Sequence, residues 1–406
     1  MIDVHEHHMP GIILNRDVGL LRLLEESYCG WTRKRPYPLP SEPPVGPMTT
    51  VEGRGTWADI SRFVEDSGSN AFVRNMVNAL AELYALPEPR ITKENWETLD
   101  DSIRARHAES GWNDAVLDRA RITMVITDPY LDPLLDATAA LGARYRSVLR
   151  VNPFALAWNP DARDHSGNSG HALMRQFCLA PETFDDYLEA LPKLFDAMPS
   201  LHKVGLKDAL AYDRPVDYGP PDPQEARKAW KNPRPTEGEK KAFSDLVVDR
   251  LCGIAGERGI PVQMHLGLGL IRGSTPLNAA GLIERHPATR FLLMHLGYPW
   301  TGELLGMAMV YRNIWIDLTW SWLLSPAHFL RSLREAIEIL PDEHRMMLGG
   351  DNWHVEETFG AITSARKLIA QVLDQCVREG EFLRGEAERL GTRILRENAA
   401  RFFALA

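Results

Sequence analysis

The sequence MIDVHEHH, residues 1–8, opens the chain and sets the first expectation for both the fold and the site. Its apolar start predicts a short β-strand. Alternate side chains of an extended strand point to the same face, so His5 and His7 would project together toward one metal ion. Neutral imidazole is a common ligand of first-row metals. Two histidines alone are a weak signal, because a catalytic zinc site needs about three protein ligands and an open position for water.

Short apolar segments recur along the rest of the chain, and each is followed by a helical pattern. Continuous apolar strands joined by helical crossovers predict a parallel sheet that is buried on both faces. Counting the first strand gives eight such units, which predicts an α/β fold of the closed (β/α)8 TIM-barrel type. The further predicted strands are residues 122–126, 148–151, 204–206, 260–264, 291–294, 314–318 and 346–348.

The stretch between the first two strands is too long for a simple crossover. It holds predicted helices at 13–34, at 56–86 with a break at Gly68, and at 93–110, while residues 35–56 are rich in proline and glycine and predict a loop. We therefore expect one metal-dependent barrel domain over residues 1–406, with a helical cap inserted over residues 35–110.

Polar side chains fall at the carboxyl ends of several predicted strands, where barrels of this kind place their catalytic groups. The expected metal ligands are three imidazoles and one carboxylate, namely His5, His7, His265 and Asp351. This set suits Zn²⁺, with Mn, Fe or Ni as alternatives, and a second metal is left open. Asp351 would accept a proton from the attacking water and return it to the leaving group. His295 would orient that water or a substrate oxygen, or bind a second metal.

Four further residues are candidates for binding the substrate. Lys207 could carry a carboxylate adduct that bridges two metals, pair with an anionic substrate, or form a salt bridge at the rim. Arg150 could hold a substrate carboxylate by its fork geometry, and the alternative is a buried salt bridge. Tyr212 follows the fourth strand and Trp353 follows the eighth, where each could line the pocket. Tryptophans at strand ends are also often simple packing.

The composition narrows the class of protein. The chain has 406 residues, of which 44% are hydrophobic, so it can bury a large core. A net charge of −9 argues against a nucleic-acid-binding surface. No apolar run is long enough for a membrane span, and the start does not resemble a signal peptide. Four scattered cysteines are expected to be free thiols in a cytoplasmic protein. The expected partner is a small-molecule substrate, and a homo-oligomer is left open.

The motifs at the strand ends resemble those of the amidohydrolase superfamily. The resemblance is carried by Asp3-Val4-His5-Glu6-His7, by one histidine closing each of strands five and six, and by Gly350-Asp351-Asn352-Trp353. The nearest branch is the amidohydrolase-related (amidohydrolase 2) group, and the chain is similar to fluG-type domains, uronate isomerases and decarboxylases of the aminocarboxymuconate-semialdehyde type. The resemblance does not extend to residues 35–110.

The resemblance implies the same ligand set for one divalent metal and a catalytic or water-orienting role for His295. It implies a hydrolase that uses metal-activated water on an amide, lactone or ester of a small, polar, anionic molecule. A non-oxidative decarboxylase (a lyase) of a small carboxylic acid and a sugar-acid isomerase are the alternatives that keep the same site. A non-catalytic barrel is the least favoured, because a decayed site should have lost at least one of these residues.

Overall fold

An eight-stranded parallel sheet is the centre of the fold. In the computed structural model, which describes residues 1–34 and 53–405, the strands are hydrogen bonded in the order in which they occur in the chain. With helices between successive strands, this is the predicted (β/α)8 barrel architecture. The strands are β1 (Ile2–Glu6), β2 (Met124–Thr127), β3 (Tyr145–Arg150), β4 (Lys203–Asp208), β5 (Val262–Met264), β6 (Phe291–Leu293), β7 (Ile314–Asp317) and β8 (Met346–Met347).

The described residues fall into two units by their internal contacts, and each unit joins segments that are distant in sequence. The first unit consists of Met1–Thr127, Leu318–Glu338 and Leu348–Glu397. The second consists of Asp128–Asp317, Ile339–Met347 and Asn398–Ala406. The single barrel domain expected from the sequence stays a prediction.

In the first unit, β1 is held on both sides. It pairs in parallel with β2, with Ile2 opposite Met124. On its other side, the backbone N–H of Val4 donates to the carbonyl of Leu348 at 3.3 Å. The carboxyl end of β1 therefore lies against the turn that follows β8, and this places the two ends of the sequence motif together.

The helices of the first unit are α1 (Pro10–Ile13), α2 (Leu20–Glu25), η1 (Tyr28–Thr32), α3 (Trp57–Val64), α4 (Ala71–Leu83), α5 (Trp96–Ala108), α6 (Trp112–Arg119), α15 (Ser321–Leu324), most of α16 (Pro326–Ile339), α17 (Val355–Arg378), α18 (Arg384–Thr392) and η6 (Arg393–Glu397). The prediction of one helix over 13–34 was wrong, since α1 ends at Ile13 and two short helices, α2 and η1, follow it. The side chain of Asn15 accepts the N–H of Asp17 at 2.8 Å, and the side chain of Ser27 accepts the N–H of Cys29 at 3.2 Å. Such local bonds compete with helix hydrogen bonds and break the element.

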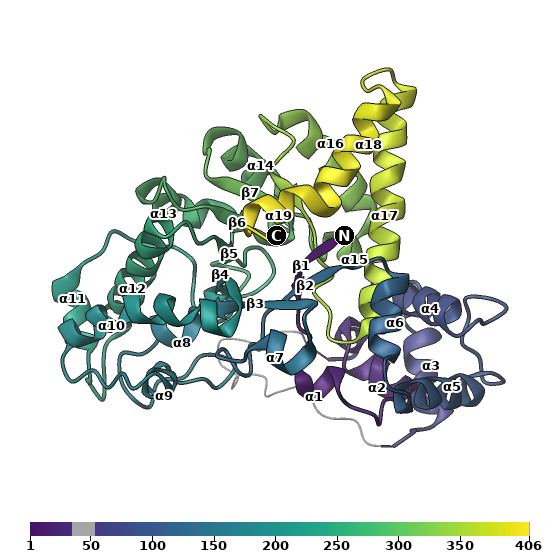
Figure 1. The fold of residues 1–406 in the computed structure, drawn as a ribbon, viewed down its shortest axis with the longest axis horizontal. Helices are drawn as coiled ribbons and strands as arrows, with labels where there is room; N and C mark the ends of the chain where they lie inside the picture. Colours follow the sequence, from purple (N-terminus) through teal and green to yellow (C-terminus); the bar gives the residue numbers. More distant parts are fainter. Residues whose placement is uncertain (35–52, 406) are drawn as a thin grey trace. The chain divides into compact units, whose positions relative to one another are not determined.

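The helices of the predicted insertion share an apolar core with α2, which precedes the insertion in the chain. Residues of α2, α3, α4 and α5 pack together, and Figure 1 shows these four helices gathered beside one another. The break expected at Gly68 separates α3 from α4, as predicted. The predicted loop over 35–56 lies outside the described residues up to position 52. Fully buried members of this core include Val18, Leu20, Leu23, Leu24, Ile60, Phe63, Leu80 and Ile103.

The second unit carries β3 to β8 and the helices that follow β3 to β6, together with α19. Its helices are α7 (Ala137–Leu141), α8 (Asn152–Ala155), α9 (Gly170–Gln176), α10 (Phe184–Ala197), η2 (Pro199–Leu201), η3 (Leu210–Tyr212), α11 (Pro223–Ala229), α12 (Glu237–Glu257), η4 (Pro276–Ala279), α13 (Ala280–Arg285), η5 (Met294–Gly297), α14 (Thr301–Val310) and α19 (Asn398–Phe402). α7 begins at Ala137, because Asp136 caps it by accepting the N–H groups of Thr138 and Ala139.

Two further expectations from the sequence are borne out. The four cysteines, Cys29, Cys178, Cys252 and Cys376, are free thiols. Among the described residues, no helix combines the length and the apolar character needed to cross a bilayer.

Candidate metal centre

The first unit brings His5, His7 and Asp351 together. One ligand atom from each lies within 4.8 Å of the others. Oδ1 of Asp351 is 3.4 Å from Nε2 of His5 and 3.2 Å from Nε2 of His7. His5 and Asp351 are buried, whereas His7 is partly exposed. The alternation of side chains along an extended strand thus gives the shared face that the sequence predicts.

The turn after β8 aims the carboxylate at the histidines. Asp351 adopts a left-handed backbone conformation with φ of 67°, which is uncommon for a residue other than glycine and typical of functional sites. Its N–H donates to the carbonyl of His5 at 2.8 Å. The preceding Gly349 approaches β1 so closely that a Cβ there would collide with the backbone of His5. A glycine is required at this position for the turn to reach the strand.

Two buried carboxyl groups of β1 support the same turn. Asp3 accepts the N–H of His5 at 3.2 Å and that of Gly350 at 3.1 Å. Glu6 accepts the N–H of Asn352. Burial raises the pKa of Asp3 to about 7 and raises the pKa of Glu6 well above its ordinary value. The proximity of Asp3 also raises the pKa of Glu6.

Aromatic rings surround one side of this cluster. Trp353 stacks on His7, with ring centroids 5.3 Å apart and an angle of 26° between the planes. The phenol of Tyr28 donates to Oδ2 of Asp351 at 2.7 Å. The ring of Tyr28 in turn contacts the rings of Trp31, Phe72, Trp320 and Trp353, at centroid distances of 4.8 to 5.2 Å. Trp353, predicted to line the pocket, thus contacts a candidate metal ligand directly.

The donor set fits a divalent cation. Two imidazoles and one carboxylate are the protein ligands that first-row divalent metals such as zinc and iron take in catalytic sites. Three protein ligands also leave coordination positions for water or substrate. His265 belongs to the second unit, and its role as a further ligand stays a prediction.

In the second unit, His265 and His295 form a hydrogen-bonded pair at the ends of β5 and β6. Nε2 of His265 lies 2.6 Å from the carbonyl oxygen of Leu268, which can only accept, so Nε2 carries the proton. Nδ1 of His265 then accepts, at 3.1 Å from Nε2 of His295 and 3.2 Å from the hydroxyl of Tyr212. Burial, reinforced by the charges of His295 and Lys207, holds the pKa of His265 well below its ordinary value. His265 is therefore neutral, the form in which imidazole binds metals.

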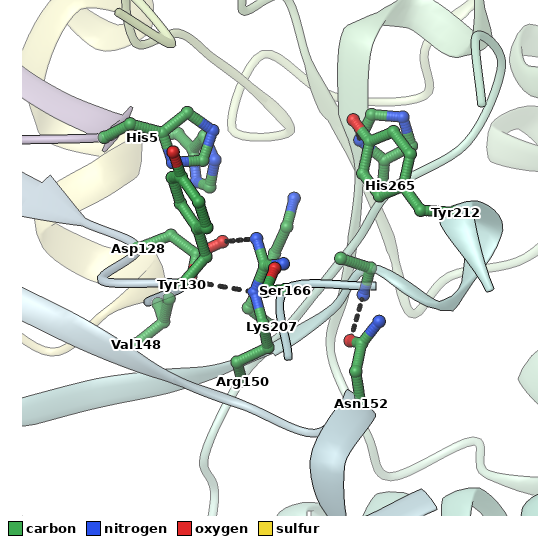
Figure 2. A network of polar contacts seen from close by, with 12 residues as sticks. His5, Asp128, Tyr130, Val148, Arg150, Asn152, Ser166, Lys207, Tyr212 and His265 are labelled. Carbon is green, nitrogen blue, oxygen red and sulfur yellow. Dashed lines mark hydrogen bonds and ion pairs between the residues drawn. The ribbon is translucent and has the colours of Figure 1, made fainter. Parts of the chain in front are cut away.

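Arg150 is engaged by an ion pair in the second unit. Figure 2 shows its guanidinium turned toward Asp128, to which Nε donates at 3.2 Å and Nη2 at 2.5 Å. Nη1 lies 3.1 Å from Nε2 of His165, and Nδ1 of His165 lies 2.9 Å from Asp213. Of the two alternatives raised by the sequence, the buried salt bridge is the one seen. The predicted contact of Arg150 with a substrate stays a prediction.

Lys207 is almost fully buried at the end of β4, and its ammonium lies 2.5 Å from the sulfur of Met294. Tyr212 sits beside His265 in Figure 2, with ring centroids 4.4 Å apart. The three roles considered for Lys207 and the substrate-binding role of Tyr212 stay predictions.

The sequence interpretation missed several residues of these clusters. Tyr28 lay in a stretch predicted as continuous helix, where nothing distinguished it from a packing residue. Asp128 directly follows β2, and the reasoning that selects Asp351 at a strand end applies to it as well. His165 and Asp213 lie in irregular loops, where no periodic pattern indicates which side chains meet.

Comparison with known proteins finds similarity to amidohydrolases over part of the chain. The amidohydrolase family model matches residues 210–405. The fluG protein of Emericella nidulans is 27% identical over 248 residues, which cover 55% of this chain and 28% of the fungal protein, so the chain spans little more than a quarter of that relative.

Two solved structures share the fold over nearly the whole chain. The uronate isomerase of Thermotoga maritima has a TM-score of 0.75 at 15% identity, covering 99% of this chain and 94% of its own. The glucuronate isomerase of Caulobacter crescentus has a TM-score of 0.72 at 15% identity, covering 100% of this chain and 91% of its own. At this identity the likeness shows the fold alone. The family match covers just under half of the chain, so the chain is similar to amidohydrolases over this part and to the fungal relative.

Proposed function

We propose that this chain is a metal-dependent hydrolase that cleaves an amide, lactone or ester bond in a small, polar, anionic molecule. The observation that carries the proposal is the buried group of His5, His7 and Asp351, with their ligand atoms within 4.8 Å of one another. These three side chains would hold one divalent cation, with Zn²⁺ first and Mn²⁺, Fe²⁺ or Ni²⁺ as alternatives. A cation bound there would lower the pKa of a water molecule to about 7 and so supply a nucleophile at neutral pH.

The chain's own groups would move the protons. Asp351 is buried, and its two oxygens face different partners, because Oδ1 lies toward the histidines and Oδ2 accepts from Tyr28. A carboxylate placed in this way can take a proton from the attacking water and return it to the leaving group. The hydrogen-bonded pair of His265 and His295 would orient the water or a substrate oxygen, in the role predicted for His295.

The proposed substrate-binding roles follow from the charge, polarity and size of the side chains. Lys207 is a buried side chain at the end of β4, and its amine would bind a substrate carboxylate or phosphate. Tyr212 would add a phenol donor, and Trp353 would pack against an apolar part of the substrate. The charge of Arg150 is already compensated by Asp128, so we assign it mainly to holding the loop after β3 in place.

The reaction can be tested in water enriched in ¹⁸O with a panel of small carboxylate-bearing amides, lactones and esters. A hydrolase places one labelled oxygen in the acid product. Release of CO₂ would instead identify a decarboxylase, and a product of unchanged formula would identify an isomerase. Either result would overturn the proposed reaction while leaving the metal site in place.

The metal requirement has a separate test. We expect the purified protein to contain a divalent metal, to lose activity with a chelator, and to regain it with Zn²⁺ or Mn²⁺. His5→Ala should abolish both metal content and turnover. His202→Ala, which removes an exposed histidine paired with Asp136, is the matched control and should change neither. Normal metal content in His5→Ala would refute the assigned site.

A further inference from the structure

We propose that Tyr28 is a positioning residue of the metal centre, and that its phenol decides which oxygen of Asp351 faces His5 and His7. This inference rests on the proposed function, because it concerns the same ligand set. No sequence motif includes Tyr28. It comes from η1, in the long stretch between β1 and β2 that the sequence marks only as helical.

The two carboxylate oxygens of Asp351 have different partners. Oδ2 accepts a hydrogen bond from the phenol of Tyr28 at 2.7 Å. Oδ1 lies 3.4 Å and 3.2 Å from the Nε2 atoms of His5 and His7. A carboxylate that is free to turn about its last bond could offer either oxygen or both. The phenol favours one orientation, in which a single oxygen faces the imidazoles.

Tyr28 is itself held in place by burial, ring contacts and a backbone hydrogen bond. Its side chain is almost fully buried, with 3% of its surface exposed, among the rings of Phe72, Trp320 and Trp353. Its backbone N–H donates to Oε1 of Glu357 at 2.9 Å, while Oε2 of Glu357 accepts from the N–H of Trp353 at 3.3 Å. The carboxyl group of Glu357 on α17 therefore joins the backbone of Tyr28 to that of Trp353, which follows Asp351 closely in the chain.

The orientation of Asp351 would affect how a cation is bound. Groups that hydrogen bond to metal ligands orient them, and removing such a group typically lowers metal affinity or activity by about 10- to 100-fold. Without the phenol, Oδ2 of Asp351 would lose this donor in a buried site, and the cation would be the strongest partner left for it. The carboxylate would then bind through both oxygens and occupy a position otherwise available to water or substrate.

Tyr28→Phe isolates this effect, because it removes one oxygen and leaves the ring in its aromatic cluster. The matched control is Tyr187→Phe, which removes the hydroxyl of another fully buried tyrosine, bonded to the carbonyl of Phe154 in the second unit. The full-length proteins are stripped of metal and titrated with Co²⁺, whose visible absorption weakens as its coordination number rises. Co²⁺ affinity is measured by chelator competition, and folding is checked by circular dichroism.

We expect folded Tyr28→Phe to bind Co²⁺ about 10- to 100-fold more weakly than the parent and to give a weaker, shifted visible spectrum. Tyr187→Phe should keep the parental affinity and spectrum even if it melts at a lower temperature. A parental spectrum and affinity in Tyr28→Phe would overturn the inference and leave the hydrolase proposal intact. Absence of Co²⁺ binding by the parent would overturn the inference and the proposed function together. If Tyr28→Phe does not fold, Glu357→Gln is measured in its place, and an unchanged spectrum there overturns the inference.

Discussion

Glu356 on α17 is a buried carboxylate that accepts hydrogen bonds from three side chains, and its removal tests how the insertion is attached. Its Oε1 accepts from the hydroxyl of Tyr84 at 2.8 Å, from Nε2 of His107 at 2.8 Å and from the indole of Trp112 at 2.9 Å. These donors come from the regions of α4, α5 and α6, so one buried oxygen joins three helices to a fourth. We predict that Glu356→Gln strongly destabilises the first unit.

The magnitude follows from the pKa of Glu356. Burial alone would raise it, but the charge and hydrogen bond of His107 and the bonds from Trp112 and Tyr84 outweigh burial and lower the pKa from 4.5 to about 2. At about 1.4 kcal/mol per pKa unit, the ionised form contributes roughly 3 kcal/mol to the free energy of unfolding. Because the folded-state pKa is the lower one, this contribution is complete above pH 4.5 and is lost as the pH falls toward 2.

The assay is urea unfolding of the parent and of Glu356→Gln at a series of pH values from 7 down to 3. Breaking a buried charged pair by removing one partner typically costs about 3–5 kcal/mol, so we expect a loss of about that size at pH 7. The difference between the two proteins should shrink as the pH falls, since the parent loses its advantage in acid. Glu388→Gln makes the same chemical change at an exposed position of α18 and should alter stability by less than about 0.5 kcal/mol.

Two results would refute this reasoning. A loss below about 1 kcal/mol at pH 7 would mean that the three donors find other partners when the charge is gone. A loss that stays constant between pH 7 and pH 3 would mean that the ionisation of Glu356 is not its source.

Two other substitutions test the packing of the candidate sites. Arg150→Met should leave the buried carboxylate of Asp128 without its partner and lower the free energy of unfolding by about 3–5 kcal/mol, measured by urea unfolding; a change below about 1 kcal/mol would show that the pair is not desolvated as described. Gly349→Ala should push the turn after β8 away from β1 and lower metal affinity as well as thermal stability, while Gly302→Ala, where a Cβ meets nothing within 4 Å, should do neither. Parental metal affinity in Gly349→Ala would contradict the described approach to His5.

The sequence predicts the architecture well, because the signals involved are local. Apolar strands and helical periods repeat along the chain, and Thr236 and Glu239, whose spacing is typical of a capping box, form one at the start of α12. The alternation of side chains in a strand predicts that His5 and His7 share a face, and a polar residue at the end of β8 supplies Asp351. Each of these inferences needs only neighbouring residues and a known period.

The parts that could not be predicted depend on contacts between distant segments. Tyr28 reaches Asp351 only because the stretch predicted as one helix breaks at Asn15 and Ser27, where side chains bond to nearby backbone N–H groups. The partners of Glu356 are separated from it by more than 200 residues, and no periodic pattern relates them. Arg150 was placed correctly at a strand end, but the sequence left open whether its partner is a substrate or a carboxylate.

The helical stretch between β1 and β2 is attached at two points to the residues that follow β8, and the two attachments can be separated by experiment. Glu356 holds its helices by three hydrogen bonds, whereas Tyr28 touches a candidate metal ligand. If these attachments are independent, Glu356→Gln should lower stability without changing the Co²⁺ spectrum, and Tyr28→Phe should change the spectrum at a small cost in stability. Glu357 lies beside Glu356 and binds the backbone of Tyr28, so a strained α17 would transmit one change to the other. A Co²⁺ spectrum altered in both variants would therefore mean that the helical stretch between β1 and β2 and the metal ligands form one cooperative element.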